Sequence, residues 1–140
     1  MARFVIDPPA AIELARGNVD IAAGHQLVAP SALRSQCLSI MYRAVRNEEL
    51  PAAEAWNLLD HITSLRIRLL NDRVSRAQTW RVAALLGSED TAEAEYIAVG
   101  QLQADYLIAL DPGLATRAGG LIALAPLAAL GQEGWPPPGL

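Results

Sequence analysis

The sequence predicts an α/β protein of three layers, with a central parallel sheet between two layers of helices. Apolar strand-like runs alternate with helical stretches through most of the 140-residue chain, the pattern of parallel strands joined by helical crossovers. Hydrophobic residues make up 52% and charged residues 19%, which excludes a disordered polymer and indicates a compact core. We expect one domain over residues 1–125 and an apolar, proline-rich tail over residues 126–140.

The expected strands are short runs of β-branched, aromatic or large aliphatic residues. They fall over residues 3–6, 27–29, 64–70, 106–110 and 121–124. In the third strand, Leu65 and Ile67 alternate with Arg66 and Arg68, which is typical of a strand with one exposed face. The fourth strand is apolar throughout after Tyr106, which favours a buried position in the sheet.

The expected helices cover residues 7–16, 31–45, 72–86 and 90–103, with further helices beginning at positions 51 and 111. Prolines follow Asp7 and Asp111, and proline fits the first turn of a helix because its missing N–H has no partner there. Glycines at 17 and 87 end the first and fourth helices. Apolar side chains at a 3.6-residue period favour the second helix.

Charge and cysteine content narrow the class of partner and the compartment. A formal net charge of −4 argues against a broad basic surface that binds duplex DNA. It does not exclude an RNA substrate, because a cluster of acidic metal ligands would account for much of the excess negative charge. The single cysteine, Cys37, cannot form an internal disulfide and shares a helical face with Leu33 and Met41, so we expect a core residue. The N-terminus carries no signal segment, and the apolar run over residues 119–131 is too short for a membrane span. We expect a cytoplasmic protein with no membrane partner.

Three acidic residues stand where strand-like runs meet helix starts: Asp7, Glu93 and Asp111. Strand ends and helix starts meet at one edge of an open α/β sheet, where ligands are held. Carboxylates gathered there are the hard oxygen ligands that Mg²⁺ or Mn²⁺ prefers. A fourth acid is expected at the opening of the helix over residues 31–45, and that position holds Gln36.

Each acid also has a purely structural interpretation. Asp7 and Asp111 suit helix N-caps, and Asp90 with Glu93 three residues later fits a capping box. Against this, three acids at one sheet edge would repel one another unless a cation neutralised them. The residues of other common sites are absent. The chain has only two histidines, which excludes a histidine-rich zinc site, and it has no P-loop, G-x-S-x-G or G-x-G-x-x-G sequence.

The order of these segments resembles the PIN-domain family, in particular the bacterial VapC-type toxin ribonucleases. The segments are a strand ending at Asp7, residues 30–33 (PSAL) with a polar residue at 36, residues 92–98 (AEAEYIA) and residues 107–111 (LIALD). The resemblance covers about residues 3–118. It implies a central parallel sheet, a Mg²⁺ or Mn²⁺ site that hydrolyses RNA phosphodiesters, a homodimer, and inhibition by a cognate antitoxin protein.

By position, Asp7 matches the first acid of that family and Asp111 the last. Glu93 stands where an aspartate is usual, and Gln36 stands where a glutamate is usual. The resemblance therefore implies Asp7, Glu93 and Asp111 as metal ligands, with Gln36 as a fourth member of the catalytic set. Gln36 keeps a carbonyl oxygen but carries no charge and cannot act as a base, so we expect weakened activity.

Two functions stay open at this point: the metal-dependent ribonuclease, and an inactive PIN-like binding or scaffolding module. The second would present Trp56, Leu59 and the apolar C-terminal segment to another chain. Trp56, Leu59 and Ile62 are expected on one helix face, and Trp56 and Trp80 are expected in the core or an interface, with base stacking as the alternative. The apolar segment over residues 121–130 predicts a homodimer, unless it folds back over its own sheet.

Overall fold

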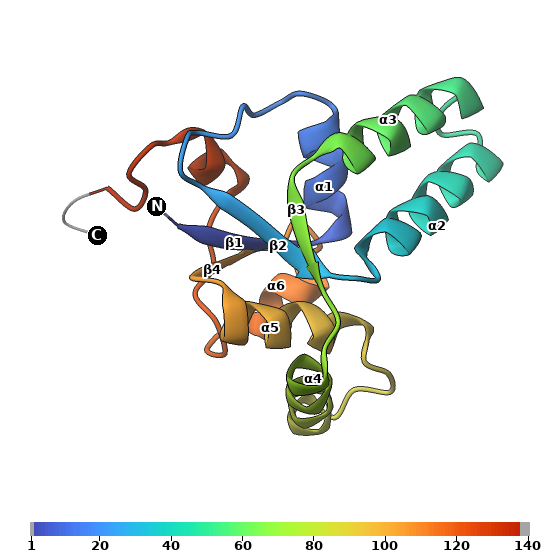
Figure 1. Cartoon of the computed structure of the whole chain (residues 1–140). Helices are drawn as coiled ribbons and strands as arrows, with labels where there is room; N and C mark the ends of the chain where they lie inside the picture. Colours follow the sequence, from blue (N-terminus) through green and yellow to red (C-terminus); the bar gives the residue numbers. More distant parts are fainter. Residues whose placement is uncertain (1, 138–140) are drawn as a thin grey trace.

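The computed structural model describes residues 2–137, and within them the chain forms one four-stranded parallel sheet in the order β3-β2-β1-β4 (Figure 1). The strands are β1 (Arg3–Ile6), β2 (Gln26–Pro30), β3 (Ile67–Leu70) and β4 (Tyr106–Ile108). At the centre of the sheet, Val5 pairs with Val28 on one side and with Leu107 on the other. The predicted α/β class with a parallel sheet is confirmed.

The helices lie on both faces of the sheet. In the same residues they are α1 (Pro8–Ala15), α2 (Leu33–Arg46), α3 (Ala52–Ser64), α4 (Arg73–Leu86), α5 (Ala92–Gln103), α6 (Pro112–Ala118) and the 3₁₀ helix η1 (Leu127–Gly131). Figure 1 shows α1 and α3 above the sheet and α4, α5 and α6 below it. Helix α5 packs across β1, β2 and β4, and α4 packs on α5, while α2 and α3 form an arm that extends from the body.

Local capping rules explain where several helices begin and end. The Asp7 side chain accepts a hydrogen bond from the Ala10 backbone and Pro8 follows, so α1 starts at that point. The Asp72 side chain and Ser75 form a reciprocal capping box at the start of α4. Gly87 ends α4 in the left-handed conformation, with φ of 65°, which glycine adopts without a Cβ clash.

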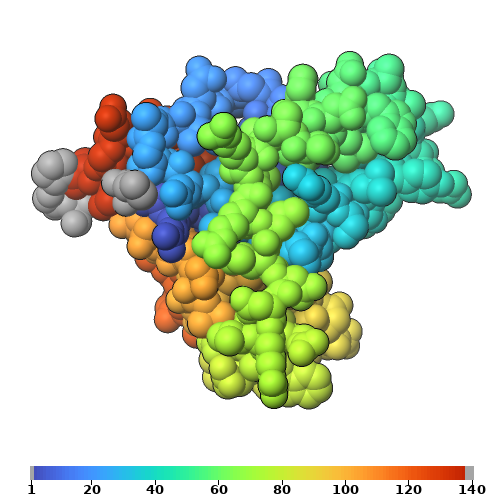
Figure 2. All heavy atoms as spheres, in the orientation of Figure 1, coloured from blue at the N-terminus to red at the C-terminus, as the bar shows by residue number. Residues whose placement is uncertain are grey.

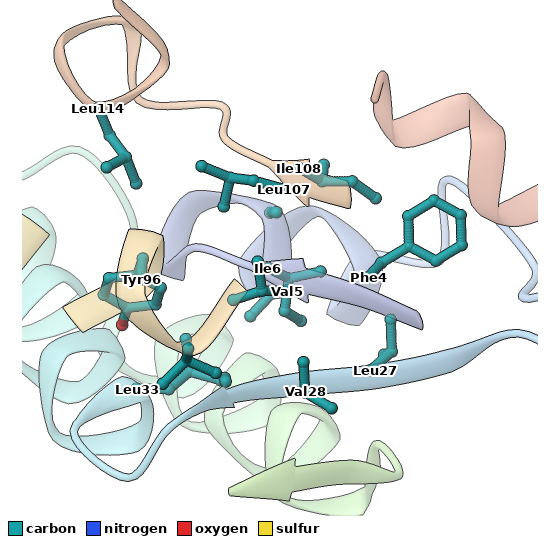
Figure 3. Packing of buried hydrophobic residues seen from close by; sticks show 14 of the residues in the cluster. Phe4, Val5, Ile6, Leu27, Val28, Leu33, Tyr96, Leu107, Ile108 and Leu114 are labelled. Carbon is teal, nitrogen blue, oxygen red and sulfur yellow. The ribbon is translucent and has the colours of Figure 1, made fainter. Parts of the chain in front are cut away.

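The core is centred on β1 and β4, whose side chains are buried after the first residue of each strand (Figure 3). Phe4, Val5 and Ile6 are packed from both sides by the helix layers, and Leu107 and Ile108 continue this layer. Cys37 is fully buried as expected, and burial raises the pKa of its thiol to about 12. An inert core cysteine follows from this environment.

Three expected strands are longer than the observed ones, while β2 extends one residue further at each end than the predicted 27–29. Helix α3 continues through residue 64, so β3 holds only residues 67–70 of the predicted 64–70. β4 ends at Ile108, two residues before the predicted end. The predicted last strand over residues 121–124 is reduced to an isolated bridge between Leu107 and Leu124. Apart from the lost last strand, each difference lies at a strand end, where assignment of the boundary is least certain from local pattern.

Helix α3 buries only one side of the face that was expected to carry Trp56, Leu59 and Ile62. Its buried side chains are Ala55, Leu58 and Ile62, whereas Trp56 is 61% exposed and Leu59 is half-buried. Positions 55, 58 and 62 follow the helical repeat, and position 56 lies one residue, or about 100°, away from that stripe. Trp56 is therefore a surface residue of the α2–α3 arm.

Helix α4 also turns a different face inward. The buried side chains are Ser75, Thr79, Val82 and Ala83. Trp80 is 75% exposed, and Val74 and Leu85 are exposed as well. The expectation that Trp80 belongs to the core was wrong, because the small and hydroxyl-bearing side of this helix faces α5. The alternative interface role of Trp80 stays a prediction.

The C-terminal segment packs on its own chain at the end of the sheet where β1 and β4 begin. Leu130 is fully buried, and its carbonyl accepts a hydrogen bond from the Ala22 backbone at 2.7 Å. The Trp135 ring lies 4.7 Å from the Tyr106 ring and 6.1 Å from the Phe4 ring, measured between centroids. Figure 2 shows this segment beside the N-terminal strand. The apolar side chains of this segment are therefore covered by its own chain, without a second copy of the protein. The homodimer stays a prediction.

Among residues 2–137, no helix is long and apolar enough to cross a membrane. The last residues of the predicted tail, 138–140, lie outside the described part of the chain.

Candidate acidic active site

Two of the predicted acids meet at the point where the strand order of the sheet reverses. β1 has β2 on one side and β4 on the other, so the gap between β1 and β4 is the topological switch point, where open α/β sheets bind their ligands. Asp7 follows β1 directly, and its backbone N–H donates to the Ile108 carbonyl of β4 at 3.2 Å. The Asp111 backbone N–H donates to Asp7 Oδ2 at 2.9 Å, which joins the two acids.

The Asp7 carboxylate is fully buried and fixed by backbone donors. Oδ1 accepts from the Ala10 N–H at 2.9 Å, and Oδ2 accepts from Asp111. Burial raises the pKa of Asp7, the backbone hydrogen bonds oppose that shift, and the nearby Asp111 charge adds to it. Each oxygen keeps lone-pair capacity beyond its one hydrogen bond. A cation beside this carboxylate would relieve the cost of its buried charge.

Asp111 is exposed, and its Oδ2 accepts from the Leu114 N–H at 3.1 Å. It is the N-cap of α6, as Asp7 is of α1, so the capping interpretation of both residues is confirmed. The capping bonds leave further acceptor capacity on the carboxylate oxygens of both residues. Capping and ligand binding are therefore compatible at both positions.

All four sequence-predicted residues line a single cavity of about 210 Å³, which we call the acidic cavity. Its lining consists of Asp7, Pro8, Pro9, Gln36, Ile40, Ala92, Glu93, Tyr96, Asp111 and Leu114. The residues come from the ends of β1 and β4 and from α1, α2, α5 and α6. The fold thus brings together side chains that are up to about a hundred positions apart in the sequence.

Glu93 is held by an arginine that the sequence analysis did not select. Arg117 of α6 donates from Nε and Nη2 to the two carboxylate oxygens of Glu93, both at 2.7 Å. The pKa of Arg117 is raised by these bonds to Glu93 and also by the charge of Asp111. A Cβ placed on Gly113 would lie 2.6 Å from Arg117 Nη2 and 3.5 Å from Asp111 Oδ2, so glycine leaves room for the guanidinium beside Asp111.

The capping box expected for Glu93 does not form. Thr91 is the N-cap of α5 without a side-chain hydrogen bond, and Asp90 Oδ1 accepts from the Ala92 N–H at 3.0 Å. Glu93 turns instead to the guanidinium of Arg117, because a bidentate charged pair is stronger than a single bond to a backbone N–H. Arg117, an exposed residue outside the cavity lining, is thus the counter-ion of Glu93.

Gln36 has a partner within the cavity wall, the hydroxyl of Tyr96, which donates to its Oε1. Tyr96 is buried, and burial raises the pKa of its hydroxyl, so Tyr96 stays a neutral donor. The bond uses part of the acceptor capacity of the only oxygen that Gln36 offers. Tyr96 is a second cavity residue that sequence reasoning missed.

The donor set fits one hydrated divalent cation held by Asp7 and Asp111. Mg²⁺ usually binds through one or two carboxylates, with water and substrate phosphate completing the octahedron. In the part of the chain that is described, no group of three or more His, Cys, Asp or Glu side chains gathers closely enough for a metal ion. A ligand role for Glu93 would therefore require release from Arg117, and that role stays a prediction.

No family model matches this chain, and no curated protein matches it. The resemblance to PIN domains therefore rests on the segment order and on the residues of the acidic cavity.

Proposed function

We propose that this protein is a PIN-type ribonuclease that depends on Mg²⁺ or Mn²⁺ and has weakened activity. One observation carries the proposal: Asp7 and Asp111 are joined at the switch point of the sheet, in a cavity that Glu93 and Gln36 also line. Paired carboxylates in such a cavity suit a divalent cation and a phosphodiester better than they suit an anionic or apolar ligand alone.

Asp7 and Asp111 would hold the ion, which would polarise a substrate phosphate and activate a water molecule. The contribution of the chain itself is preorganisation. The Asp7 carboxylate is fixed by the Ala10 and Asp111 N–H groups, so little rearrangement is needed when a ligand enters. Asp111 is fixed in the same way by the first turn of α6.

Two features of the cavity account for weakened activity. Gln36 is neutral and bonded to Tyr96, so it neither adds negative charge nor accepts a proton from water. Arg117 neutralises Glu93 and lies near Asp111, which opposes the approach of a second cation. Both features lower the affinity for a divalent ion without disturbing the fold.

The alternative is a PIN-like module that binds a partner without catalysis. Exposed apolar side chains on the α2–α3 arm favour it, namely Leu38, Tyr42 and Trp56. A cavity of about 190 Å³ lies between Leu38, Trp56 and Leu59 on this arm. The partner would be a protein with an apolar helix or strand, such as an antitoxin or a second copy of the chain.

Cleavage of a fluorogenic single-stranded RNA in the presence of Mn²⁺ tests the proposal, with Asp111→Asn as the main variant. Asparagine caps a helix as well as aspartate does, so this variant keeps α6 and removes one charge. We expect slow cleavage by the wild type, none in EDTA, and a large loss in Asp111→Asn. Asp60→Asn is the matched control, because Asp60 is an exposed acid outside the acidic cavity.

Cleavage that survives EDTA, or that is equal in Asp111→Asn and the wild type, would show that the acidic cavity is not the catalytic site. Absence of cleavage together with tight binding of a protein partner would favour the binding module.

A further inference from the structure

A second cavity, of about 110 Å³, lies at the same edge of the sheet, beyond the ends of β2 and β3. We call it the hydroxyl pocket, because four of its lining residues carry hydroxyl groups: Ser31, Ser75, Thr79 and Thr91. Helices α4 and α5 form its other walls. Its volume holds several water molecules, or part of a small ligand whose remainder lies outside the pocket.

Thr79 gives the strongest sign that the hydroxyl pocket receives a ligand. It is only 7% exposed, and its hydroxyl makes no hydrogen bond to the described part of the chain. Ser75, one turn earlier, is satisfied by Asp72. Within the described residues, the one side-chain polar atom that has neither solvent contact nor a hydrogen-bond partner is His25 Nδ1. The Thr79 hydroxyl therefore keeps some solvent contact, and Thr79 lines the hydroxyl pocket. A ligand that enters the pocket can therefore form a hydrogen bond with the Thr79 hydroxyl in place of water.

The other polar groups of the pocket can form hydrogen bonds with the polar atoms at the edge of a heterocyclic ring. Asn71 offers an amide with donors and an acceptor, and Glu95 offers a half-buried carboxyl whose pKa is raised by burial. At the rim, the exposed Trp80 ring provides a flat surface for stacking. Arg76, one helical turn before Trp80, is exposed and can pair with a phosphate.

The hydroxyl pocket and the acidic cavity share the first turn of α5. Thr91 and Glu95 line the hydroxyl pocket, while Ala92, Glu93 and Tyr96 line the acidic cavity. The two cavities therefore lie on neighbouring sides of the same helical turn. A nucleotide chain that places a phosphodiester in one would place a neighbouring base near the other.

We infer that the hydroxyl pocket binds one unpaired base of an RNA strand, with Trp80 stacked on the base and Arg76 beside its phosphate. The choice of RNA rests on the proposed function. The pocket selects single strands, since a base can enter only when it is not paired or stacked in a duplex. It adds substrate affinity next to the acidic cavity without contributing to the chemical step.

Binding is tested with the full chain in EDTA, by anisotropy of a fluorescein-labelled single-stranded RNA hexamer. Thr79→Val removes the hydroxyl and keeps the volume, and we expect the affinity to fall about tenfold, as for the loss of one buried hydrogen bond. Thr63→Val is the matched control, because the Thr63 hydroxyl lies on the exposed side of α3. Trp80→Ala should also weaken binding, while Trp56→Ala, at the other exposed tryptophan, should not.

Competitors separate the base from the phosphate. Adenosine and uridine 5′-monophosphates should displace the hexamer at lower concentration than ribose 5-phosphate or inorganic phosphate. Equal competition by ribose 5-phosphate would overturn the base assignment, and so would unchanged affinity in Thr79→Val with a folded circular dichroism spectrum. The binding assay contains EDTA and does not require cleavage, so its result is independent of the RNA-cleavage assay. If the protein cleaves RNA but its RNA affinity is unchanged in Thr79→Val, the base-binding role of the hydroxyl pocket is refuted and the proposed function is not.

Discussion

Replacing Leu130 by alanine should destabilise the fold, although this residue lies in a segment that the sequence assigns to a tail. Leu130 is fully buried in η1. The substitution removes three buried carbons, worth about 0.8 kcal/mol each, and leaves a cavity that adds to the loss. We expect the free energy of unfolding to fall by about 2–5 kcal/mol.

Urea unfolding followed by circular dichroism measures this change, at several protein concentrations. Leu124→Ala is the matched control, because Leu124 lies six residues before Leu130 and is 43% exposed. That variant should lose clearly less stability than Leu130→Ala. Equal losses in the two variants would refute the packing of η1 on its own chain. Unfolding midpoints that rise with concentration for the wild type and not for Leu130→Ala would assign Leu130 to a dimer interface instead.

Three further predictions concern the acidic cavity. Arg117→Gln should tighten Mn²⁺ binding in a calorimetric titration, because the substitution frees Glu93 and removes a positive charge. The control Arg66→Gln, at an exposed arginine, should leave the Mn²⁺ affinity unchanged. Weaker Mn²⁺ binding by Arg117→Gln would contradict the role of Arg117 as a counter-ion. Gln36→Glu should also tighten Mn²⁺ or Mg²⁺ binding, since a carboxylate replaces an amide, and equal affinity would place residue 36 outside any working site. The pKa of Asp7 is raised, so the metal-free folded state binds the carboxyl proton more tightly than the unfolded state does. The free energy of unfolding of the wild type, relative to that of Asp7→Asn, should therefore fall as the pH rises from 3.8 through the raised pKa. If this difference between the two proteins does not change with pH over that window, the burial of the acid is contradicted.

The junction between β1 and α1 could be predicted from the sequence because local rules suffice there. A short apolar run ends at Asp7, and the two prolines after it fix a helix start. The same reasoning placed Asp111 at the start of α6. Parallel strands then bring both positions to one edge, so their meeting in a cavity follows from topology.

The inward faces of α3 and α4 could not be predicted in this way. In α4 the large apolar residues Val74, Trp80 and Leu85 are exposed, whereas Ser75 and Thr79 face the interior. The buried positions 75, 79, 82 and 83 fit a 3.6-residue period, but two of them are polar, and tertiary packing against α5 decides the buried side.

Arg117 was missed for a related reason. Its partner Glu93 lies 24 residues earlier, so no local spacing marks the pair, while the spacing of Asp90 and Glu93 favoured a capping box that does not form. Charged pairs between helices on one face of a sheet depend on the packing of those helices, which periodicity alone does not determine.

The central claim is that Asp7 and Asp111 hold a divalent cation at the switch point of the sheet. Its most direct test is anomalous scattering from crystals of the protein soaked in Mn²⁺. We predict a Mn²⁺ peak within ligand distance, about 2–2.5 Å, of carboxylate oxygens of both residues, and no such peak in crystals of Asp111→Asn. A Mn²⁺-soaked wild-type crystal without a peak in the acidic cavity, or with its peak bound at other side chains, would contradict the claim.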